Sequence, residues 1–265
     1  MRKFEIGIIG CGNMSVAIWQ GILDAGLAKG SDIIVSDTDE VKLQYASDRG
    51  LSVTRDNKDI LLAKYIIFAV KPQIFSEVAN ALCGKTGDSV LISIMAGINS
   101  AKIKSLTGSA KIARIMPNTP CMVKKGVSAV SFCDVGKSEQ EYILQLFRSI
   151  GEVIEIPEAK FDAVTSVSGS GPAYIYMFLD GMIKGGIRGG LTYEESKKLA
   201  VATMQGAAEM VRQKETPLDE LVQAVCSKGG TTIEAVNIYR QKELVELIGE
   251  GIEACRKRSE ELSKL

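Results

Sequence analysis

The sequence predicts an α/β fold in which a doubly wound, mostly parallel sheet is followed by an all-α region. Two observations carry this prediction. Up to residue 156, short apolar runs alternate with helical patterns, the order that builds a parallel sheet with crossover helices. Beyond Pro157 no strand pattern occurs, and helical patterns continue to the end. We therefore expect two domains, residues 1–160 and residues 161–265.

The first apolar run, residues 4–9, ends in the turn Gly10-Cys11-Gly12, and a helical pattern follows. This order suits the pyrophosphate of a dinucleotide. Gly10 permits a tight turn, Gly12 lets the backbone approach the phosphates, and the amides at the helix start meet their charge. Ser15 stands where the Rossmann-type fingerprint has its third glycine. We interpret residues 1–160 as a Rossmann-type dinucleotide-binding domain.

An acidic residue follows the second predicted strand. Residues 32–36 end at Asp37, about 20 residues beyond the glycine turn, where dinucleotide-binding folds place the carboxylate that binds the ribose hydroxyls. A polar residue that merely opens a loop is the structural alternative. A carboxylate here repels a 2′-phosphate, so Asp37 favours NADH over NADPH, and Thr38 and Lys42 keep that preference slight.

The strands are predicted from apolar runs that end in turn residues. Residues 65–70 form a continuously apolar run, which is typical of a central parallel strand. This run stops at Lys71-Pro72, because proline cannot continue the ladder, and such carboxyl ends face the ligand crevice. The predicted strands are residues 4–9, 32–36, 51–53, 65–70, 89–94, 111–115, 127–132 and 152–156.

The helices are predicted from their periodicity and from capping residues. Asn99 or Ser100 caps one helix, Thr192 and Glu195 form a capping box before another, and Pro172 suits a first helical turn. The predicted helices are residues 13–21, 40–49, 58–64, 74–82, 99–107, 138–150, 159–166, 172–187, 192–214, 216–226, 231–240 and 244–262.

Two polar, glycine-bearing segments interrupt the helical half, residues 168–171 and residues 227–232. Each is expected to be a loop that ends on a helix N-terminus, where free amides and the helix dipole favour a carboxylate. Simple helix capping explains the serines and threonines equally well. It explains less well the two glycines followed by two threonines at 229–232.

Composition excludes several classes of function. The 32 basic and 32 acidic residues give a net charge of zero, which leaves no electrostatic footprint for nucleic acid. The apolar runs are far too short to span a bilayer, and the first predicted strand starts too early to leave room for a signal peptide. We expect a soluble, cytoplasmic protein with neither nucleic-acid nor membrane partners.

Histidine is absent from the sequence, so His-based triads and His-ligated metals are excluded. The six cysteines form no C-x-x-C pair. We therefore predict no metal site, and any proton donor must be a hydroxyl, a carboxyl, a lysine or water.

Five motifs in order give the chain a resemblance to the pyrroline-5-carboxylate reductase family over nearly its whole length. They are Gly10-x-Gly12-Asn13-Met14-x-x-Ala17, Ala69-Val70-Lys71-Pro72-Gln73, Met116-Pro117-Asn118-Thr119-Pro120, Ser168-Gly169-Ser170-Gly171-Pro172-Ala173-Tyr174 and Ser227-Lys228-Gly229-Gly230-Thr231-Thr232-Ile233. The chain departs from the family pattern at Lys228, where proline is usual, and at Ser15, where glycine is common.

The resemblance implies reduction of the cyclic imine 1-pyrroline-5-carboxylate to L-proline, the last step of proline biosynthesis, with hydride from NADH or NADPH. It also implies that residues 161–265 bind the substrate and interlock between subunits, so that the chain forms a homo-oligomer, at least a dimer and in some relatives a larger ring. A protonated imine is already electrophilic, so the protein's task is to orient the reactants.

The resemblance further assigns site residues. Thr232 is the leading catalytic residue, because its hydroxyl would hydrogen-bond the ring nitrogen. The residues implied to surround the substrate are Glu215, Val225, Ser227, Gly229, Gly230, Thr231 and Thr232. The residues implied to hold the coenzyme are Gly10, Gly12, Asn13, Met14, Asp37, Val70, Lys71, Pro72, Ala96, Asn118 and Thr119.

Two other readings compete with this one. A β-hydroxyacid dehydrogenase or another imine reductase shares the two-domain plan but takes its proton from a lysine of the helical domain. The candidates Lys184, Lys197, Lys198 and Lys228 lack that family's glycine-containing setting. A non-catalytic dinucleotide-binding redox sensor would need the glycine turn but not residues 227–232.

Overall fold

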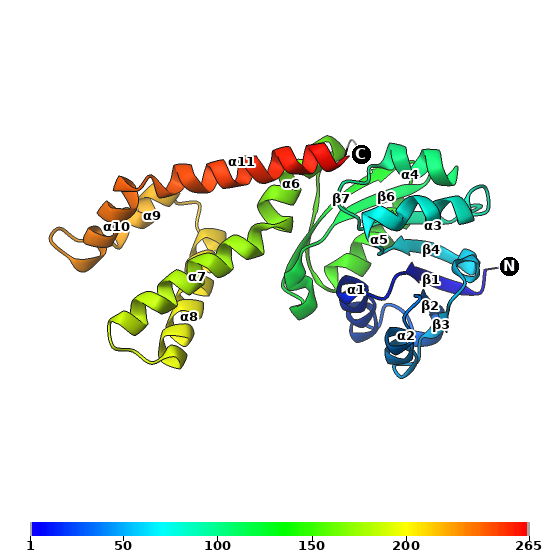
Figure 1. Cartoon of the computed structure of the whole chain (residues 1–265), viewed down its shortest axis with the longest axis horizontal. Helices are drawn as coiled ribbons and strands as arrows, with labels where there is room; N and C mark the ends of the chain where they lie inside the picture. Colours follow the sequence, from blue (N-terminus) through cyan, green and yellow to red (C-terminus); the bar gives the residue numbers. More distant parts are fainter. Residues whose placement is uncertain (1, 264–265) are drawn as a thin grey trace. The chain divides into compact units, whose positions relative to one another are not determined.

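The computed structural model describes residues 2–263. Residues 4–155 contain an eight-stranded sheet with the order β3-β2-β1-β4-β5-β6-β7-β8, which is drawn at the right of Figure 1. All neighbouring strands pair in parallel except β6 and β7, which are antiparallel. The strands are β1 Phe4–Ile9, β2 Ile33–Ser36, β3 Ser52–Thr54, β4 Ala63–Phe68, β5 Val90–Ser93, β6 Ile112–Met116, β7 Gly126–Cys133 and β8 Gly151–Glu155.

The predicted doubly wound sheet is therefore confirmed. The antiparallel pair follows from chain length: only residues 117–125 separate β6 from β7, and a parallel connection needs a crossover of a dozen or more residues. These residues form the short 3₁₀ helix Thr119–Val123 instead, and the chain returns beside the strand it has just left.

Helices cover both faces of the sheet, and each face has its own apolar core. On one face, helices α1 and α5 pack on alternate residues of the central strands, with Trp19 and Phe147 fully buried there. On the other face, α3 and α4 pack on the intervening residues, with Phe68 and Phe75 in an edge-to-face contact at 5.2 Å. Burial on both faces explains why residues 65–68 of β4 and residues 90–92 of β5 are continuously apolar.

The helix bounds agree closely with the sequence expectations, and two predicted caps are confirmed. Asn99 Oδ1 accepts a hydrogen bond from Lys102 N, and Thr192 and Glu195 form the capping box. The helices are α1 Asn13–Asp24, α2 Glu40–Ser47, α3 Phe75–Leu82, α4 Ser100–Thr107, α5 Lys137–Arg148, α6 Phe161–Val164, α7 Gly171–Arg188, α8 Tyr193–Gln213, α9 Leu218–Ala224, α10 Thr231–Gln241 and α11 Leu244–Ser263.

Two local expectations were wrong. Residues 58–64 form the 3₁₀ helix Asn57–Leu62 and then the start of β4, rather than one α-helix. Residues 168–171 are not a loop. The chain continues from α6 through the π-helical turn Thr165–Gly169, and only Ser170 separates that turn from α7.

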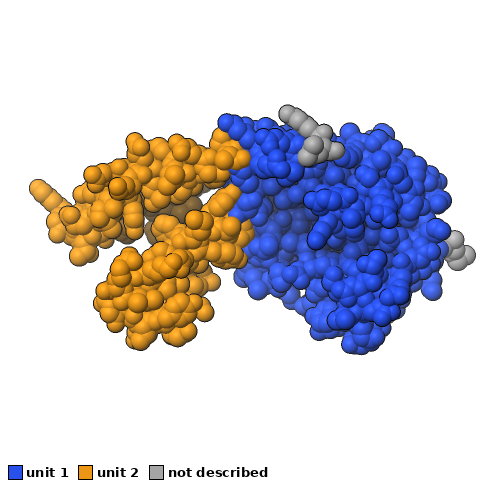
Figure 2. Space-filling model, viewed as in Figure 1, with its two compact units in different colours: residues 1–170, 255–265 blue, residues 171–254 orange. Residues whose placement is uncertain are grey.

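The chain divides into two compact units, coloured separately in Figure 2. Unit 1 comprises residues 1–170 and 255–265, and unit 2 comprises residues 171–254. The end of α11 thus belongs with the sheet, because Ser259 Oγ donates to Asp162 Oδ1 at 2.6 Å and Gly97 lies against the backbone of Leu262. Within unit 2, α7 and α8 approach closely where Gly186 faces the side chain of Ser196. The expected division at residue 160 stays a prediction about the domains.

Replacing Ser15 with alanine should stabilise the protein. The Ser15 hydroxyl in α1 is buried and has no hydrogen-bond partner, so folding removes it from water without compensation. Alanine also has the higher helix propensity. We expect the free energy of unfolding in urea to rise by about 1 kcal/mol. Ser31→Ala, at an exposed site, is the control and should change it by less than about 0.5 kcal/mol.

Candidate coenzyme and substrate sites

The predicted coenzyme residues all follow the carboxyl ends of parallel strands. Gly10 and Gly12 come after β1, Asp37 after β2, Val70-Lys71-Pro72 after β4, Ala96 after β5 and Asn118-Thr119 after β6. Because these strands run parallel, their ends meet at one edge of the sheet, where open α/β folds bind ligands. The order reverses at β1, so the glycine turn lies at the switch point of the sheet.

The turn after β1 requires glycine at position 10 for two reasons. The φ angle of Gly10 is +99°, which other residues rarely adopt, and a Cβ would lie 2.6 Å from Ala69 O. Gly10 N also donates to Ser36 O at 2.8 Å, so this one residue joins the ends of β1 and β2 and contacts the chain after β4. Gly12 has an ordinary φ of −82°, and a Cβ there would meet no protein atom within 4 Å.

The N-terminus of α1 is open to an anion. Gly12 is the N-cap, no side chain caps the helix, and no acidic residue stands in its first turn. Two other helices that follow parallel strands have their own acceptors. Asp39 Oδ1 accepts from the amides of α2 at 3.0 and 3.4 Å, and Glu158 Oε1 accepts from Ser100 N of α4 at 2.8 Å. The first turn of α1 therefore fits a pyrophosphate, with free amides and a glycine that leaves space for it.

The Asp37 carboxylate links the glycine turn after β1 to the segment before α2. Its Oδ2 accepts from Cys11 N in the glycine turn at 2.7 Å, and its Oδ1 accepts from Asp39 N at 2.9 Å. Each carboxylate oxygen keeps a second lone pair for a ribose hydroxyl. Burial, followed by the charge of Asp37, raises the pKa of the Cys11 thiol, so that thiol stays protonated within the turn.

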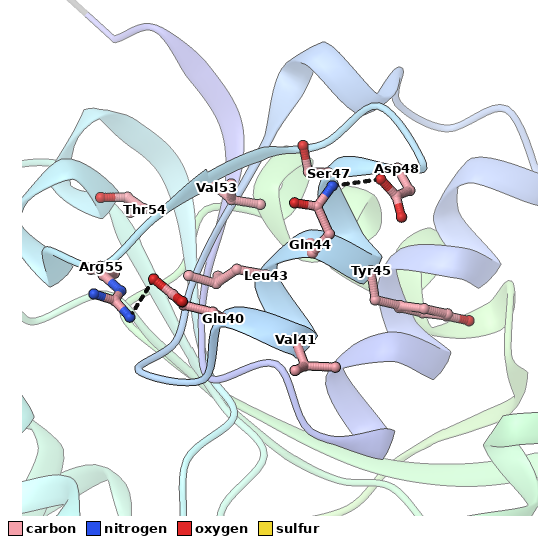
Figure 3. Close-up of a pocket in the computed structure, with 10 residues that line it drawn as sticks. All are labelled: Glu40, Val41, Leu43, Gln44, Tyr45, Ser47, Asp48, Val53, Thr54 and Arg55. Carbon is pink, nitrogen blue, oxygen red and sulfur yellow. Dashed lines mark hydrogen bonds and ion pairs between the residues drawn. The ribbon is translucent and has the colours of Figure 1, made fainter.

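An open groove of about 870 Å³ lies between α2 and β3, beside the segment that contains Asp37 (Figure 3). The charged groups along it have partners: Arg55 pairs with Glu40 at 2.7 Å, and Asp48 accepts a hydrogen bond from the Gln44 side-chain amide at 2.7 Å. The Arg55–Glu40 pair is largely exposed, so it contributes little to stability. Backbone hydrogen bonds from α2, chiefly that of Lys42, lower the pKa of Asp39 and keep it ionised beside Asp37.

The remaining predicted coenzyme residues differ in exposure. Lys71, Ala96 and Thr119 are exposed, whereas Val70 packs partly on the sheet core. Asn118 is buried, with both ends of its side-chain amide in use. Its Oδ1 accepts from Val127 N at 3.0 Å, and its Nδ2 donates to Ser168 O at 3.2 Å.

The predicted substrate residues belong to unit 2 and follow the ends of α8 and α9. Gly229 has a φ of +73°, and Gly230 N donates to Ser227 O at 3.0 Å, so Ser227–Gly230 forms a tight loop onto α10. Gly230 is the N-cap of α10 and no side chain caps the helix. Among the described residues, neither the Thr231 nor the Thr232 hydroxyl has a hydrogen-bond partner, so both remain available beside the free amides.

Glu215 and Val225 are also exposed in unit 2. Glu215 lies in the segment between α8 and α9, and Val225 ends α9 with 66% of its surface exposed. The other polar segment, residues 168–171, does not form the anion site that the sequence suggested. Ser170 N donates to Thr165 O at 2.8 Å and the Ser168 hydroxyl donates to Val164 O, so these groups serve the π-helical turn.

A partly buried ion pair at the start of α4 was not predicted from the sequence. Arg114 in β6 pairs with Glu158 Oε1 at 3.1 Å, and its guanidinium lies 4.7 Å from the centre of the Phe161 ring. Glu158 in turn accepts from both the amide and the hydroxyl of Ser100. An arginine inside a predicted buried strand was the available signal, because a buried charge needs a partner.

The sheet and the glycine turn at its switch point define a dinucleotide-binding protein, and comparisons with known proteins identify it as an NAD(P)-dependent oxidoreductase. The profile of the pyrroline-5-carboxylate reductase dimerisation family matches residues 158–262. A second profile, described as NADP oxidoreductase coenzyme F420-dependent, matches residues 5–97. The chain is 34% identical to pyrroline-5-carboxylate reductase of Escherichia coli over 98% of each chain, and 33% identical to that of Synechocystis over 99% of each.

Solved structures give the same result. Plasmodium falciparum pyrroline carboxylate reductase, solved with NADP bound, superposes with a TM-score of 0.91 at 30% identity over 99% of each chain. The reductase from Coxiella burnetii gives 0.90 at 31% identity, over 99% of this chain and 100% of that one. The chain belongs to the pyrroline-5-carboxylate reductase family. Within the described residues no helix is long and apolar enough to cross a membrane.

Gly12→Val should prevent coenzyme binding while leaving the fold intact. The new side chain meets no protein atom and φ is ordinary, so stability should fall by about 1 kcal/mol or less. The Kd for NADH, measured by fluorescence titration, should rise at least about 100-fold, because the side chain fills the phosphate position. Gly10→Val is the contrasting variant and should destabilise by about 3 kcal/mol. Normal NADH binding by Gly12→Val would remove the turn from the coenzyme site.

Proposed function

We propose that this chain reduces 1-pyrroline-5-carboxylate to L-proline, with its carboxyl-edge residues holding the coenzyme and the Ser227–Thr232 segment holding the substrate. One observation carries the substrate assignment. The N-terminus of α10 has a glycine N-cap, no capping side chain and two threonine hydroxyls that have no hydrogen-bond partner among residues 2–263. A helix start with these features offers donors to one carboxylate, and the substrate has one.

The reaction requires hydrogen-bond donors to the substrate that are neutral and stay neutral during turnover. The substrate is a cyclic imine that accepts a hydride at carbon and holds a proton at nitrogen. The coenzyme supplies the hydride when bound. Ser227, Gly230 and Thr231 then hold the carboxylate through hydroxyl and amide donors, and Thr232 hydrogen-bonds the ring nitrogen. A threonine hydroxyl is a poor acid, so Thr232 orients the ring while the proton comes with the substrate or from water.

Glu215 and Val225 complete the proposed substrate pocket, and the coenzyme is proposed to contact the remaining predicted residues. The pyrophosphate lies on Gly12, Asn13 and Met14 at the start of α1, and Asp37 receives the ribose hydroxyls. The nicotinamide end extends along Val70, Lys71, Pro72, Ala96, Asn118 and Thr119. What supports this placement is their common position at the carboxyl edge of the sheet.

NADH is the proposed preferred coenzyme. A 2′-phosphate bound after β2 would approach the carboxylates of Asp37 and Asp39, and the amides at the start of α2 are already bound to Asp39. Lys42 lies 3.5 Å from Asp39, and Arg55 pairs with Glu40, so the nearby cations already face carboxylates. Like-charge repulsion then weakens NADPH binding relative to NADH binding.

A homo-oligomer, at least a dimer, is also proposed, acting in the cytoplasm. Helix α7 has no buried residue in the single chain, although it is rich in large apolar side chains. Tyr176, Met177 and Phe178 are between 43% and 75% exposed, and Val245 of α11 is 76% exposed. Apolar faces of this extent are typical of an interface with another chain, which is the role named in the matching dimerisation profile.

The direct test is pyrroline-5-carboxylate-dependent oxidation of NADH and NADPH by the purified protein. Thr232→Ala should lower kcat by about 10- to 100-fold without changing the Kd for NADH, because it removes a group that orients the ring and does not touch the coenzyme. Thr232→Ser keeps the hydroxyl and should retain most of the activity. Equal turnover by Thr232→Ala and the unaltered enzyme would remove Thr232 from the mechanism.

Asp37→Ser should lower the ratio of kcat/KM for NADH to that for NADPH by about tenfold or more, because it removes the charge that repels the 2′-phosphate. Serine also loses the contact to Cys11 N, so activity with both coenzymes should fall. Asp37→Asn keeps an acceptor for Cys11 N and isolates the effect of charge. An unchanged ratio in both variants would contradict the role given to Asp37.

A further inference from the structure

The buried Asn118 side chain joins two segments that meet beside the end of β6. Its Oδ1 accepts from Val127 N of β7, and its Nδ2 donates to Ser168 O of the π-helical turn. The orientation of the amide is determined by its partners, because Val127 N–H only donates and the Ser168 carbonyl only accepts. Asn118 O also accepts from Cys121 N, which fixes the 3₁₀ turn that follows.

The Ser168 carbonyl lacks its α-helical donor because of the sequence that follows it. In an α-helix this carbonyl would accept from the amide of residue 172, and Pro172 has no N–H. The neighbouring register is already π-helical, as the bond from Ser170 N to Thr165 O shows. The Asn118 side chain supplies a donor to this carbonyl from outside the helix, where the α-helical donor is missing.

The π-helical turn is held on two further sides. Met116 at the end of β6 lies against Gly169, where a Cβ would be 2.8 Å from the Met116 methyl. On the α11 side, Cys255 Sγ lies 3.3 Å from Ser170 Oγ, and Ser259 donates to Asp162. The turn is thus a fixed support against which the 116–120 segment is placed.

We propose that Asn118 is a positioning residue: it ties the 116–120 segment to the Ser168 carbonyl, which Pro172 leaves without its helical donor, and so fixes the place of Thr119. This inference rests on the proposed location of that segment along the nicotinamide end of the coenzyme. It assigns Asn118 an effect on turnover that passes through Ser168 and is separate from the coenzyme contact proposed for the same residue.

The test is a double-mutant cycle with Asn118→Asp and Pro172→Ala. Aspartate keeps an acceptor for Val127 N but has no donor for Ser168 O, so kcat should fall about 10- to 100-fold and the apo protein should melt at a lower temperature. Pro172→Ala restores the N–H four residues after Ser168 and should by itself change kcat less than about threefold. Combined with Asn118→Asp, it should recover part of the lost melting temperature but not the lost kcat, because an N–H at residue 172 satisfies the Ser168 carbonyl without tying residues 116–120 to it.

Asn99→Asp is the matched control, because aspartate caps α4 as well as asparagine does, and it should leave kcat and melting temperature unchanged. Recovery of kcat in the double variant would overturn the proposal, because the loss would then come from the unsatisfied carbonyl and not from the lost tie to residues 116–120. A melting temperature of the apo protein that Asn118→Asp leaves unchanged would overturn it too, since a residue that acts only by touching the coenzyme does not stabilise the apo protein. Full activity of Asn118→Asp would overturn it as well.

If Asn118→Asp fails to fold, Asn118→Ala in the same two backgrounds gives the same comparison. Inactivity of the unaltered enzyme would instead reject the proposed function.

Discussion

The place of every predicted coenzyme residue depends on one constraint: β1 lies between β2 and β4, where the strand order reverses. Chains leaving β1 and β4 must diverge from this point, and Gly10 fits there with φ +99° and with no room for a side chain against Ala69 O. The hydrogen bonds from Gly10 N to Ser36 O and from Cys11 N to Asp37 then tie the turn to the end of β2. A larger residue at position 10 would disturb three strand ends at once.

Helix N-termini in this chain differ in whether the protein itself supplies their acceptor. Those of α2 and α4 receive carboxylates from Asp39 and Glu158, while α1 and α10 begin at Gly12 and Gly230 with no capping side chain. Leaving amides without acceptors costs stability that a capping serine or aspartate would restore. These two open helix starts lie at two of the three glycine segments that the sequence suggested for ligands, Gly10–Gly12 and residues 227–232, which is the pattern expected where a ligand completes the cap.

Most of the fold could be predicted from the sequence because its signals are local. The continuous apolar run before Lys71, the Gly10–Gly12 turn and the Thr192–Glu195 capping box each act within a few residues. The failures have long-range causes. Residues 168–171 suggested a loop because glycine and serine usually break helices, yet contacts with Asn118, Met116 and Cys255 keep the segment helical in a π register. Likewise, the hydrogen bonds of Asp37 depend on where the turn after β1 lies, which no pattern around residue 37 encodes.

The proposed substrate site contains no imidazole that could titrate near neutral pH, because the sequence has no histidine. Its donors are backbone amides and the hydroxyls of Ser227, Thr231 and Thr232, none of which titrates near neutral pH. Binding of the carboxylate then does not vary with pH through these donors, and the protonation state of the imine itself governs how readily the carbon accepts a hydride. Such a site depends on where a few neutral groups lie. The start of α10 places them, because Gly229 and Gly230 let the backbone turn tightly enough to bring Ser227, Thr231 and Thr232 to one helix end.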